Sequence, residues 1–272
     1  MVLYFIGLGL GDEKDITVKG LEAVQKSTYI YLESYTSCLI TPKSKLEEFY
    51  GKPIIEADRI MVESGCDEML ERAKNNDVSF LVVGDPFCAT THSDLFMRAA
   101  KLHIQLIVIH NASIFTAIGY SGLQLYKFGE TVSVPFFTER WRPYSFYNKI
   151  LENKRRGLHT LVLLDIKVKE QSEEDLMRGR LVFQPPRFMT ANIACQQILE
   201  AEDNTQSGLI QRNDLVIGLL RMGTPQQTIV VKPIEEMANM ENLGDPLHSL
   251  IIPGELHEIE QEMMQFHSNT IN

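Results

Sequence analysis

The sequence predicts an α/β protein of two domains, and three observations indicate this fold class. In residues 1–110, short apolar runs typical of buried strands alternate with amphipathic stretches typical of helices, which predicts a mostly parallel sheet covered by helices. After residue 129, several strand-like runs are joined by short turns, which predicts a mixed sheet with antiparallel pairs. The chain has 272 residues, enough for two hydrophobic cores. We expect an N-terminal α/β domain over residues 1–112 and a C-terminal α/β domain over residues 113–272.

The N-terminal domain begins with an apolar run, residues 2–6 (VLYFI), that predicts a strand. Alternating glycines at residues 7–11 follow it, and glycines at such a place let the backbone approach a ligand closely. Thr17 is the expected cap of an amphipathic helix that ends near Ser27. The next elements predicted are a strand at 29–32, a helix at 43–50, a strand at 53–55 and a helix at 62–75.

Residues 79–92 (SFLVVGDPFCATTH) hold the strand and turn around which this domain is organised. The apolar run at 79–83 has the length of a buried strand, and the segment Gly84-Asp85-Pro86 ends it. An acidic residue at the carboxyl end of a buried strand, beside a glycine, is typical of ligand sites in open α/β sheets. A strand-to-helix turn with a capping aspartate is the simpler interpretation of Asp85.

A helix and a strand complete the N-terminal domain. Ser93 or Thr91 is expected to cap a helix at residues 94–102, and a strand follows at 106–109. Ser113 is the expected cap of the next helix, which opens the C-terminal domain.

The C-terminal domain is predicted to combine two long helices with several strands. Residues 135–144 form an aromatic and basic loop that holds the only tryptophan. The segment Gln184-Pro185-Pro186-Arg187 forces an extended stretch before the second helix. The helices are predicted at 144–153 and 190–202. The strands are predicted at 132–134, 160–164, 215–219, 228–231 and 250–252.

Composition and charge narrow the class of protein. The formal net charge of −10 argues against broad non-specific binding to nucleic acid. The N-terminal apolar run has no preceding positive charge and meets Asp12 and Glu13 at once, so neither a signal peptide nor a membrane span is predicted. The four cysteines show no CxxC pair and no zinc-site spacing, and we expect reduced thiols of a cytoplasmic protein without a metal site. They are Cys38, Cys66, Cys88 and Cys195.

Several common motifs are absent from the sequence. It contains no GxxxxGK[ST], and the GLGLG of residues 7–11 is not a dinucleotide fingerprint. Asp12 and Glu13 would also repel a pyrophosphate there. Ser121 lies one residue short of the GxSxG spacing of a hydrolase elbow. The scattered histidines are expected to be mostly structural, with His248, just before a strand, as the best candidate for a site: His92, His110, His159 and His248.

Three turns are predicted to edge one ligand crevice at the ends of the strands. They are residues 7–11, 84–88 and 111–114. They offer one carboxylate, small residues and many backbone groups, which suits an uncharged or zwitterionic nucleoside-like ligand better than a polyphosphate. The run 154–156 is usually a solvated helix end. An alternative is a basic surface for an acidic or phosphorylated partner, formed by that run with Arg140, Arg142, Arg178 and Arg180.

Six segments, in the same order along the chain, resemble the diphthine synthases of the eukaryotic type, also called diphthine methyl ester synthases. They are residues 3–17 (LYFIGLGLGDEKDIT), 80–95 (FLVVGDPFCATTHSDL), 109–114 (IHNASI), 122–133 (GLQLYKFGETVS), 160–172 (TLVLLDIKVKEQS) and 245–251 (DPLHSLI). The resemblance extends from residue 2 to about residue 265. The GLGLGD and GDP segments alone point to the wider family of tetrapyrrole-methylase-like methyltransferases.

The resemblance implies an S-adenosylmethionine-dependent methyltransferase of diphthamide biosynthesis, with S-adenosylhomocysteine as the product. Its acceptor would be a modified histidine of translation elongation factor 2 that carries a 3-amino-3-carboxypropyl arm. The amino group becomes a trimethylammonium and the carboxylate a methyl ester. The resemblance also implies the two-domain tetrapyrrole-methylase-like fold with the cofactor in the interdomain cleft, a cytoplasmic homodimer, and neither nucleic acid nor membrane as a direct partner.

Carried over position by position, the resemblance implies a set of cofactor contacts from both domains. They are Leu10, Asp85, Cys88, Ser113, Ile114, Leu164, Met222 and His248. Position 88 departs from the glycine expected in the family. Because the contact there is expected through the backbone, Cys88 should be tolerated with a slightly narrower pocket.

Methyl transfer from a sulfonium neutralises the positive charge on sulfur, so the reaction gains little from strong electrostatic stabilisation. No catalytic triad is therefore expected. Holding donor and nucleophile at near-attack distance can supply up to ~7–11 kcal/mol. The amine must lose a proton before each attack, and Asp165 is the candidate acceptor, although capping the next turn is an equally good role. The carboxylate is already ionised at neutral pH and needs no base.

Two other functions stay open at this point. One is a protein that binds the nucleoside or the elongation factor without turnover. The other is a methyltransferase for a small tetrapyrrole, against which the basic and aromatic segment 136–144 argues.

Overall fold

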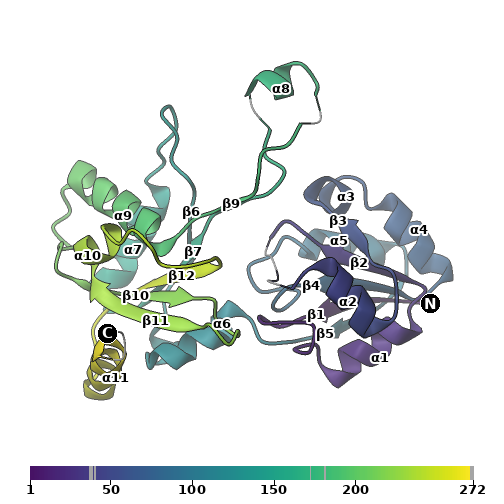
Figure 1. Ribbon diagram of the computed structural model, residues 1–272, viewed down its shortest axis with the longest axis horizontal. Coiled ribbons are helices and arrows are strands. Elements are labelled where there is room, and N and C mark those ends of the chain that lie inside the picture. The colour runs from purple at the N-terminus through teal and green to yellow at the C-terminus, as the bar shows by residue number, and fades with distance from the viewer. Residues whose placement is uncertain (37–38, 40, 172, 181, 270–272) are drawn as a thin grey trace. The chain divides into compact units, whose positions relative to one another are not determined.

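The structure, a computed structural model, describes residues 1–36, 39, 41–171, 173–180 and 182–269 (Figure 1). The chain forms two compact units, Met1–Ala117 with Gly223–Pro225, and Ile118–Met222 with Gln226–Asn272. Whether it folds as two independent domains divided after residue 112 stays a prediction.

The N-terminal unit contains a five-stranded sheet in the order β3-β2-β4-β1-β5, in which every neighbouring pair is parallel. The prediction of a mostly parallel sheet is therefore confirmed. All five residues of the central strand β4 are buried, as expected for a strand covered on both faces. The strands are β1 (Val2–Gly7), β2 (Tyr29–Glu33), β3 (Ile55–Ala57), β4 (Val78–Val82) and β5 (Gln105–Ile109).

Helices cover both faces of this sheet because successive strand residues point to opposite sides. Phe5 and Phe80 belong to one hydrophobic cluster, and Ile6 and Leu81 belong to another. The first cluster is completed by α3 (Arg59–Glu63), α4 (Asp67–Asn75) and α5 (Ser93–Lys101), and the second by α1 (Val18–Lys26) and α2 (Lys43–Tyr50). Thr17 caps α1 as predicted, since its hydroxyl accepts from the Gly20 N–H at 3.0 Å.

The single helix predicted at residues 62–75 is wrong, because the chain forms α3 and α4 there. The Asp58 carboxylate accepts from the Met61 N–H at 2.9 Å, so the first helix starts earlier than the apolar pattern suggests. The Gly65 N–H bonds to the Ile60 carbonyl at 2.8 Å, which ends that helix.

The side chains expected to cap α5 do not cap it. The N-cap residue is His92, which makes no side-chain capping bond, and Ser93 is already helical. The Thr91 hydroxyl instead donates to the Glu63 carboxylate at 3.1 Å. A tertiary contact has replaced the local one that the sequence predicts.

The C-terminal unit contains a five-stranded sheet in the order β11-β10-β12-β7-β6. Only the β6–β7 pair is parallel and the other three are antiparallel, so the predicted mixed sheet is confirmed. The strands are β6 (Val132–Val134), β7 (Thr160–Leu164), β10 (Leu215–Leu220), β11 (Thr228–Pro233) and β12 (His248–Ile252). A separate pair is formed by β8 (Ile166–Lys167) and β9 (Arg187–Phe188).

The core of the C-terminal unit packs the sheet against three helices. They are α7 (Ser145–Arg155), α9 (Ala191–Thr205) and α10 (Ile234–Ala238). The last helix, α11 (Glu258–Asn269), packs against β11 and the 3-10 segment Ile118–Ser121, and the sequence pattern did not predict it. The other short helices are α6 (Ile114–Ala117), α8 (Glu173–Met177) and a 3-10 turn at Leu125–Lys127. Within the described part of the chain, none of the helices combines the length and hydrophobicity needed to cross a membrane.

Candidate functional site

The turns that follow β1 and β4 pair with each other at the carboxyl edge of the parallel sheet. Gly9 and Gly84 form an antiparallel bridge, with N···O distances of 3.2 and 2.7 Å, and both have φ of +77°. A Cβ on Gly7 would lie 2.6 Å from the Gly84 carbonyl oxygen and 2.8 Å from the Asn111 Cβ. The strand ends are thus packed backbone to backbone, which only glycine allows.

Asn111 attaches the turn after β5 to the turn after β1. Its Nδ2 donates to the Gly7 carbonyl and to the Asp15 carbonyl, both at 2.9 Å. The Asp15 carboxylate in turn accepts from the Gly11 N–H at 2.7 Å. The three turns predicted to edge a crevice are therefore held together by hydrogen bonds within the N-terminal unit.

Asp85 lies at the centre of this edge and is buried. Its Oδ1 accepts from the Phe87 N–H at 3.0 Å, and its Oδ2 accepts from His110 Nδ1 at 2.7 Å and from the Asn111 N–H at 3.3 Å. Burial raises the pKa of this carboxyl, but the hydrogen bonds from Phe87, His110 and Asn111 outweigh burial and lower the pKa below its usual value. Asp85 is therefore an ionised carboxylate at neutral pH.

Ser113 carries a buried hydroxyl that has no hydrogen-bond partner among the described residues. It does not cap a helix through its side chain, which corrects the sequence prediction. Instead the Ser113 N–H donates to the Thr116 hydroxyl at 3.1 Å, and the Ser113 carbonyl accepts from the Thr116 N–H at 3.0 Å. A buried polar group without a partner costs about 1–3 kcal/mol, so this hydroxyl is a candidate contact for a ligand.

The other predicted cofactor residues of this unit lie in the same turns. Cys88 is half-buried, and its N–H donates to the Asp85 carbonyl at 3.3 Å. Leu10 is half-buried, with its Cβ 2.5 Å from the position that a Cβ on Gly223 would take. Ile114 is half-buried and begins α6. Cys66, Cys88 and Cys195 are free thiols, and Cys38 lies outside the described residues.

His92 supports the same turn from the protein interior. It is fully buried, and its Nδ1–H donates to the Pro86 carbonyl at 2.9 Å, to which the Thr90 hydroxyl also donates at 2.7 Å. Burial lowers the pKa of His92. The structural role predicted for this histidine is consistent with these contacts.

The remaining predicted cofactor residues lie near one end of the C-terminal sheet. Leu220 pairs with His248 and Leu163 pairs with Ser249. Leu164 therefore ends β7, Met222 lies two residues after β10 and His248 begins β12, all at the same end of the sheet. His248 Nδ1 accepts from the Ala191 N–H at 3.4 Å, and its Nε2 donates to the Asp245 carbonyl at 2.9 Å. Burial lowers the pKa of His248, and both ring nitrogens are engaged.

Asp165 has partners of its own. Its Oδ2 accepts from the Phe136 N–H at 3.0 Å and lies 3.3 Å from Lys167 Nζ, while its carbonyl accepts from the Met189 N–H at 2.9 Å. These contacts favour the structural alternative for this residue. Its role as a proton acceptor stays a prediction.

His110 is the residue of this site that sequence reasoning missed, since it was grouped with structural histidines. Its side chain is 72% exposed and pairs with a buried carboxylate. The available signal was its position, directly after the apolar run 106–109 and therefore at the same sheet edge as Asp85.

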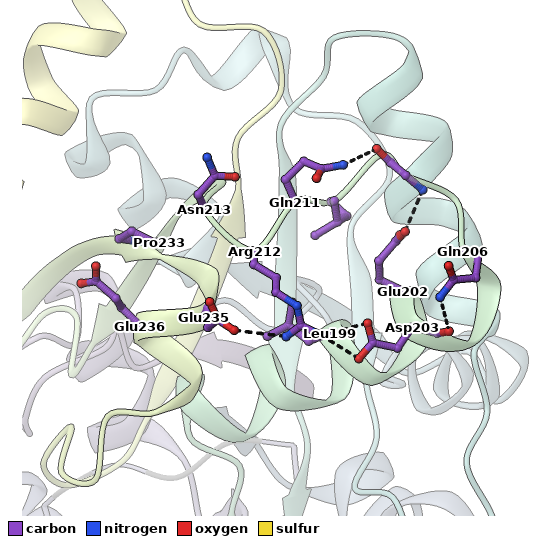
Figure 2. A pocket seen from close by; sticks show the side chains of 12 residues that line it. Leu199, Glu202, Asp203, Gln206, Gln211, Arg212, Asn213, Pro233, Glu235 and Glu236 are labelled. Atoms are coloured by element: carbon purple, nitrogen blue, oxygen red, sulfur yellow. Dashed lines mark hydrogen bonds and ion pairs between the residues drawn. The ribbon is translucent and has the colours of Figure 1, made fainter.

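A hollow of about 600 Å³ lies elsewhere, between the end of α9, the loop after it, and α10 of the C-terminal unit (Figure 2). Arg212 points between Asp203 and Glu235 there, at 3.0 and 3.3 Å. None of the predicted site residues lines this hollow. Across the described ranges, no group of three or more His, Cys, Asp or Glu side chains could hold a metal ion.

Three of the seven basic residues considered as a partner surface are paired with acids. Arg142 contacts Glu200 at 2.7 Å, Lys154 contacts Asp214 at 2.5 Å, and Arg178 contacts Glu174 at 2.8 Å. These three side chains already have acidic partners within the chain, and the alternative of an acidic or phosphorylated partner stays a prediction.

Comparison with known proteins defines the class. The family model for Tetrapyrrole (Corrin/Porphyrin) Methylases matches residues 2–238. A solved structure described as diphthine synthase superposes with a TM-score of 0.84 at 32% identity, covering 99% of this chain and 96% of that chain.

Curated relatives narrow the class further. Diphthine methyl ester synthase from Dictyostelium discoideum is 55% identical over 267 residues, with 97% of each chain covered. The protein of the same name from Homo sapiens is 53% identical over 272 residues, covering 98% of this chain and 95% of the relative. The chain therefore belongs to the tetrapyrrole methylase family and, within it, to the diphthine methyl ester synthases. These relatives support methylation in diphthamide biosynthesis, and the methyltransferase class and the fold predicted from the sequence are confirmed.

Proposed function

We propose that this chain transfers methyl groups from S-adenosylmethionine to the 3-amino-3-carboxypropyl-histidine of translation elongation factor 2. The amino group would become a trimethylammonium and the carboxylate a methyl ester. The observation that carries this proposal is the identity of 53–55% over nearly the whole chain to relatives named diphthine methyl ester synthase.

The residues at the carboxyl edge of the N-terminal sheet fit a nucleoside-like sulfonium cofactor. Glycine turns leave backbone groups accessible, the Ser113 hydroxyl is buried without a partner in the described structure, and the Asp85 carboxylate is ionised. The residues proposed to hold the cofactor are Leu10, Asp85, Cys88, Ser113, Ile114, Leu164, Met222 and His248. When bound, the cofactor supplies an electrophilic methyl group on sulfur.

The contribution of the protein is chiefly to position the two reactants. The turns around Gly9 and Gly84 are fixed by backbone bonds, and Asn111 fixes the third turn against them. Preorganised turns hold a bound donor in one orientation without further ordering cost, which is the effect that proximity catalysis requires. Asp165 remains one candidate to accept the proton of the acceptor amine.

We further propose that the chain acts as a cytoplasmic homodimer on elongation factor 2. The proposal of a cytoplasmic location is supported by the free thiols of Cys66, Cys88 and Cys195. The dimer rests on the family resemblance, and sedimentation velocity would test it through the mass of the particle.

Mass spectrometry of elongation factor 2 tests the proposed function. The factor carrying the aminocarboxypropyl-histidine precursor is incubated with this protein and S-adenosylmethionine, and the sample is quenched in acid to preserve an ester. A gain of four methyl groups is expected. A gain of three would contradict ester formation, and no gain with the cofactor bound would favour a protein without turnover. Factor that lacks the arm is the matched control and should gain nothing.

A further inference from the structure

His110 and Asp85 form an aspartate–histidine pair at the carboxyl edge of the sheet. The two side chains come from different turns and meet at 2.7 Å between Nδ1 and Oδ2. The Asp85 side chain is 7% exposed and that of His110 is 72% exposed. A buried carboxylate therefore holds an imidazole that faces outward.

The hydrogen bonds determine which ring nitrogen carries the proton. Asp85 is an ionised acceptor that also receives the N–H groups of Phe87 and Asn111, so Nδ1 of His110 must be the donor. In the neutral ring the lone pair then lies on Nε2. Among the described residues, Nε2 of His110 has no hydrogen-bond partner. Orienting an imidazole in this way is how a carboxylate prepares a general base.

We propose that His110 is the catalytic residue that accepts the proton of the acceptor amine, and that Asp85 positions it. This inference rests on the proposed function. It deepens that function by assigning the base for the amine methylations, for which Asp165 was the candidate named from the sequence.

Each amine methylation needs one such proton transfer. Nε2 of His110 takes a proton from the substrate ammonium, and the freed nitrogen lone pair attacks the methyl carbon. The N–C bond forms as the C–S bond breaks, and the electron pair of that bond goes to sulfur. The imidazolium then releases its proton to water. Three methyl groups therefore require three proton transfers to His110, and the ester step requires none because a carboxylate is already ionised.

The other candidate bases are less suitable. Asp165 already accepts from the Phe136 N–H and lies beside Lys167. His92 is fully buried, and both ring nitrogens of His248 have partners. His110 is the exposed one. It lies next to Asp85 and three residues before Ser113, both of which are proposed cofactor contacts.

The test compares the two chemical steps in the same variant. His110→Asn is the variant of choice because the asparagine amide can take the place of Nδ1 and donate to Asp85, while it lacks a basic nitrogen at the Nε2 position. One substrate is elongation factor 2 with the free amine, and the other is the factor whose amine is already trimethylated, so that only the ester can form. Single-turnover rates are measured by mass spectrometry with the protein saturated with S-adenosylmethionine.

His110→Asn should slow the amine methylations by about 10²-fold or more and leave the ester rate within about twofold of wild type. Calorimetry should give an unchanged Kd for S-adenosylmethionine. His110→Gln should show the same split between the two steps. His103→Asn, which replaces an exposed histidine before β5, is the control and should match wild type in both steps.

Three outcomes would overturn the assignment. Unchanged amine methylation in His110→Asn would show that another group takes the proton. An equal loss in both steps, with weaker cofactor binding, would make His110 a binding residue instead. If wild-type protein methylates neither substrate, the proposed function itself has failed, and this outcome is distinct from the other two.

Discussion

At the scale of single residues, Asp85 is the side chain on which the site depends most. Replacing it with arginine removes the carboxylate and puts a cation at the position proposed to contact a cationic sulfonium cofactor. We expect Asp85→Arg to abolish binding of S-adenosylmethionine while the protein stays folded, as measured by calorimetry and circular dichroism. Asp85→Asn, with nearly the same volume, is the milder companion variant. Unchanged affinity in Asp85→Arg would remove this residue from the site.

The Ser113 hydroxyl gives a second prediction, in which removal of a buried polar group does not lower the free energy of unfolding. Because this buried group has no partner in the described structure, Ser113→Ala should leave the free energy of unfolding unchanged or slightly higher. If the hydroxyl binds the cofactor, the same variant should bind it roughly three- to tenfold more weakly. Denaturant titration and calorimetry measure the two effects.

Ser121 is the matched control for Ser113, because it is also a buried serine but its hydroxyl is paired. It donates to the Ile118 carbonyl at 2.7 Å and accepts from the Leu123 N–H at 3.3 Å. Ser121→Ala should therefore cost about 1–3 kcal/mol of stability. If Ser113→Ala destabilises the protein as much as Ser121→Ala, the hydroxyl of Ser113 has a partner within the protein. It is then not free to contact a ligand.

The sequence makes some residue roles predictable and hides others. Asp85 could be selected because a glycine, a proline and a preceding apolar run mark it locally. The sequence placed His110 at the same sheet edge as Asp85, but their hydrogen bond could not be predicted, since the two residues lie 25 positions apart and meet only in the folded sheet. The same holds for Thr91, whose contact with Glu63 replaced the predicted cap.

At the scale of elements, the glycine turn after β1 carries a prediction about stability. A Cβ at position 7 would come within 2.6 Å of the Gly84 carbonyl oxygen and 2.8 Å of the Asn111 Cβ, and neither backbone atoms nor a Cβ can move away cheaply. Gly7→Ala should cost about 1–3 kcal/mol and weaken cofactor binding, because all three turns must shift.

Gly119→Ala is the control for Gly7→Ala. The nearest atoms to a Cβ at position 119 belong to Leu125, at 3.8 Å or more, which is an ordinary contact distance. Thermal denaturation of both variants should show a lower midpoint for Gly7→Ala alone. Equal midpoints would mean that the turn adapts without strain.

Elements with strong apolar periodicity were predictable, and those that depend on tertiary contacts were not. The strands of both sheets follow from short apolar runs, except that β3 (Ile55–Ala57) begins at the last residue of the strand predicted at 53–55. The helix pair α3 and α4 was predicted as one helix because the amphipathic pattern continues across Gly65. The Asp58 cap that starts α3 and the break at Gly65 depend on hydrogen bonds that this pattern does not show. Helix α11 was missed because its exposed Ile259 and Phe266 obscure the apolar face.

At the scale of the whole molecule, three buried histidines connect stability to pH. Burial lowers the pKa of His92, His159 and His248 below the ordinary value of 6.5. In the unfolded chain these groups take up protons as the pH falls through 6.5, while in the folded chain they stay neutral. The unfolded state then binds more protons, so stability must decrease on acidification.

The contacts of His159 extend this dependence to lower pH. Its Nδ1 accepts from the Gly254 N–H at 3.0 Å, so its Nε2 donates to the buried Glu260 at 3.2 Å. Burial raises the pKa of Glu260, but the N–H groups of Gln124 and His257, together with His159, outweigh burial and lower it. The stability that Glu260 contributes is present above the ordinary carboxyl range and is lost as the pH falls through its lowered pKa.

We therefore expect the free energy of unfolding to fall steadily from about pH 7.5 to about pH 5.5. Chemical denaturation at a series of pH values measures this. His103→Asn should give the same slope, since that side chain is exposed and the asparagine tolerates its φ of 56°. A flat profile over this range would contradict the account of the buried histidines.

The central claim about the whole molecule is that the carboxyl edge of the N-terminal sheet binds the methyl donor. A crystal structure of the protein with S-adenosylhomocysteine tests this most directly. We predict ligand density beside the turns that follow β1, β4 and β5, with a polar ligand atom within hydrogen-bond distance of the Ser113 hydroxyl. Density elsewhere, such as in the hollow around Arg212, or a ligand that leaves Ser113 without a partner, would contradict the account.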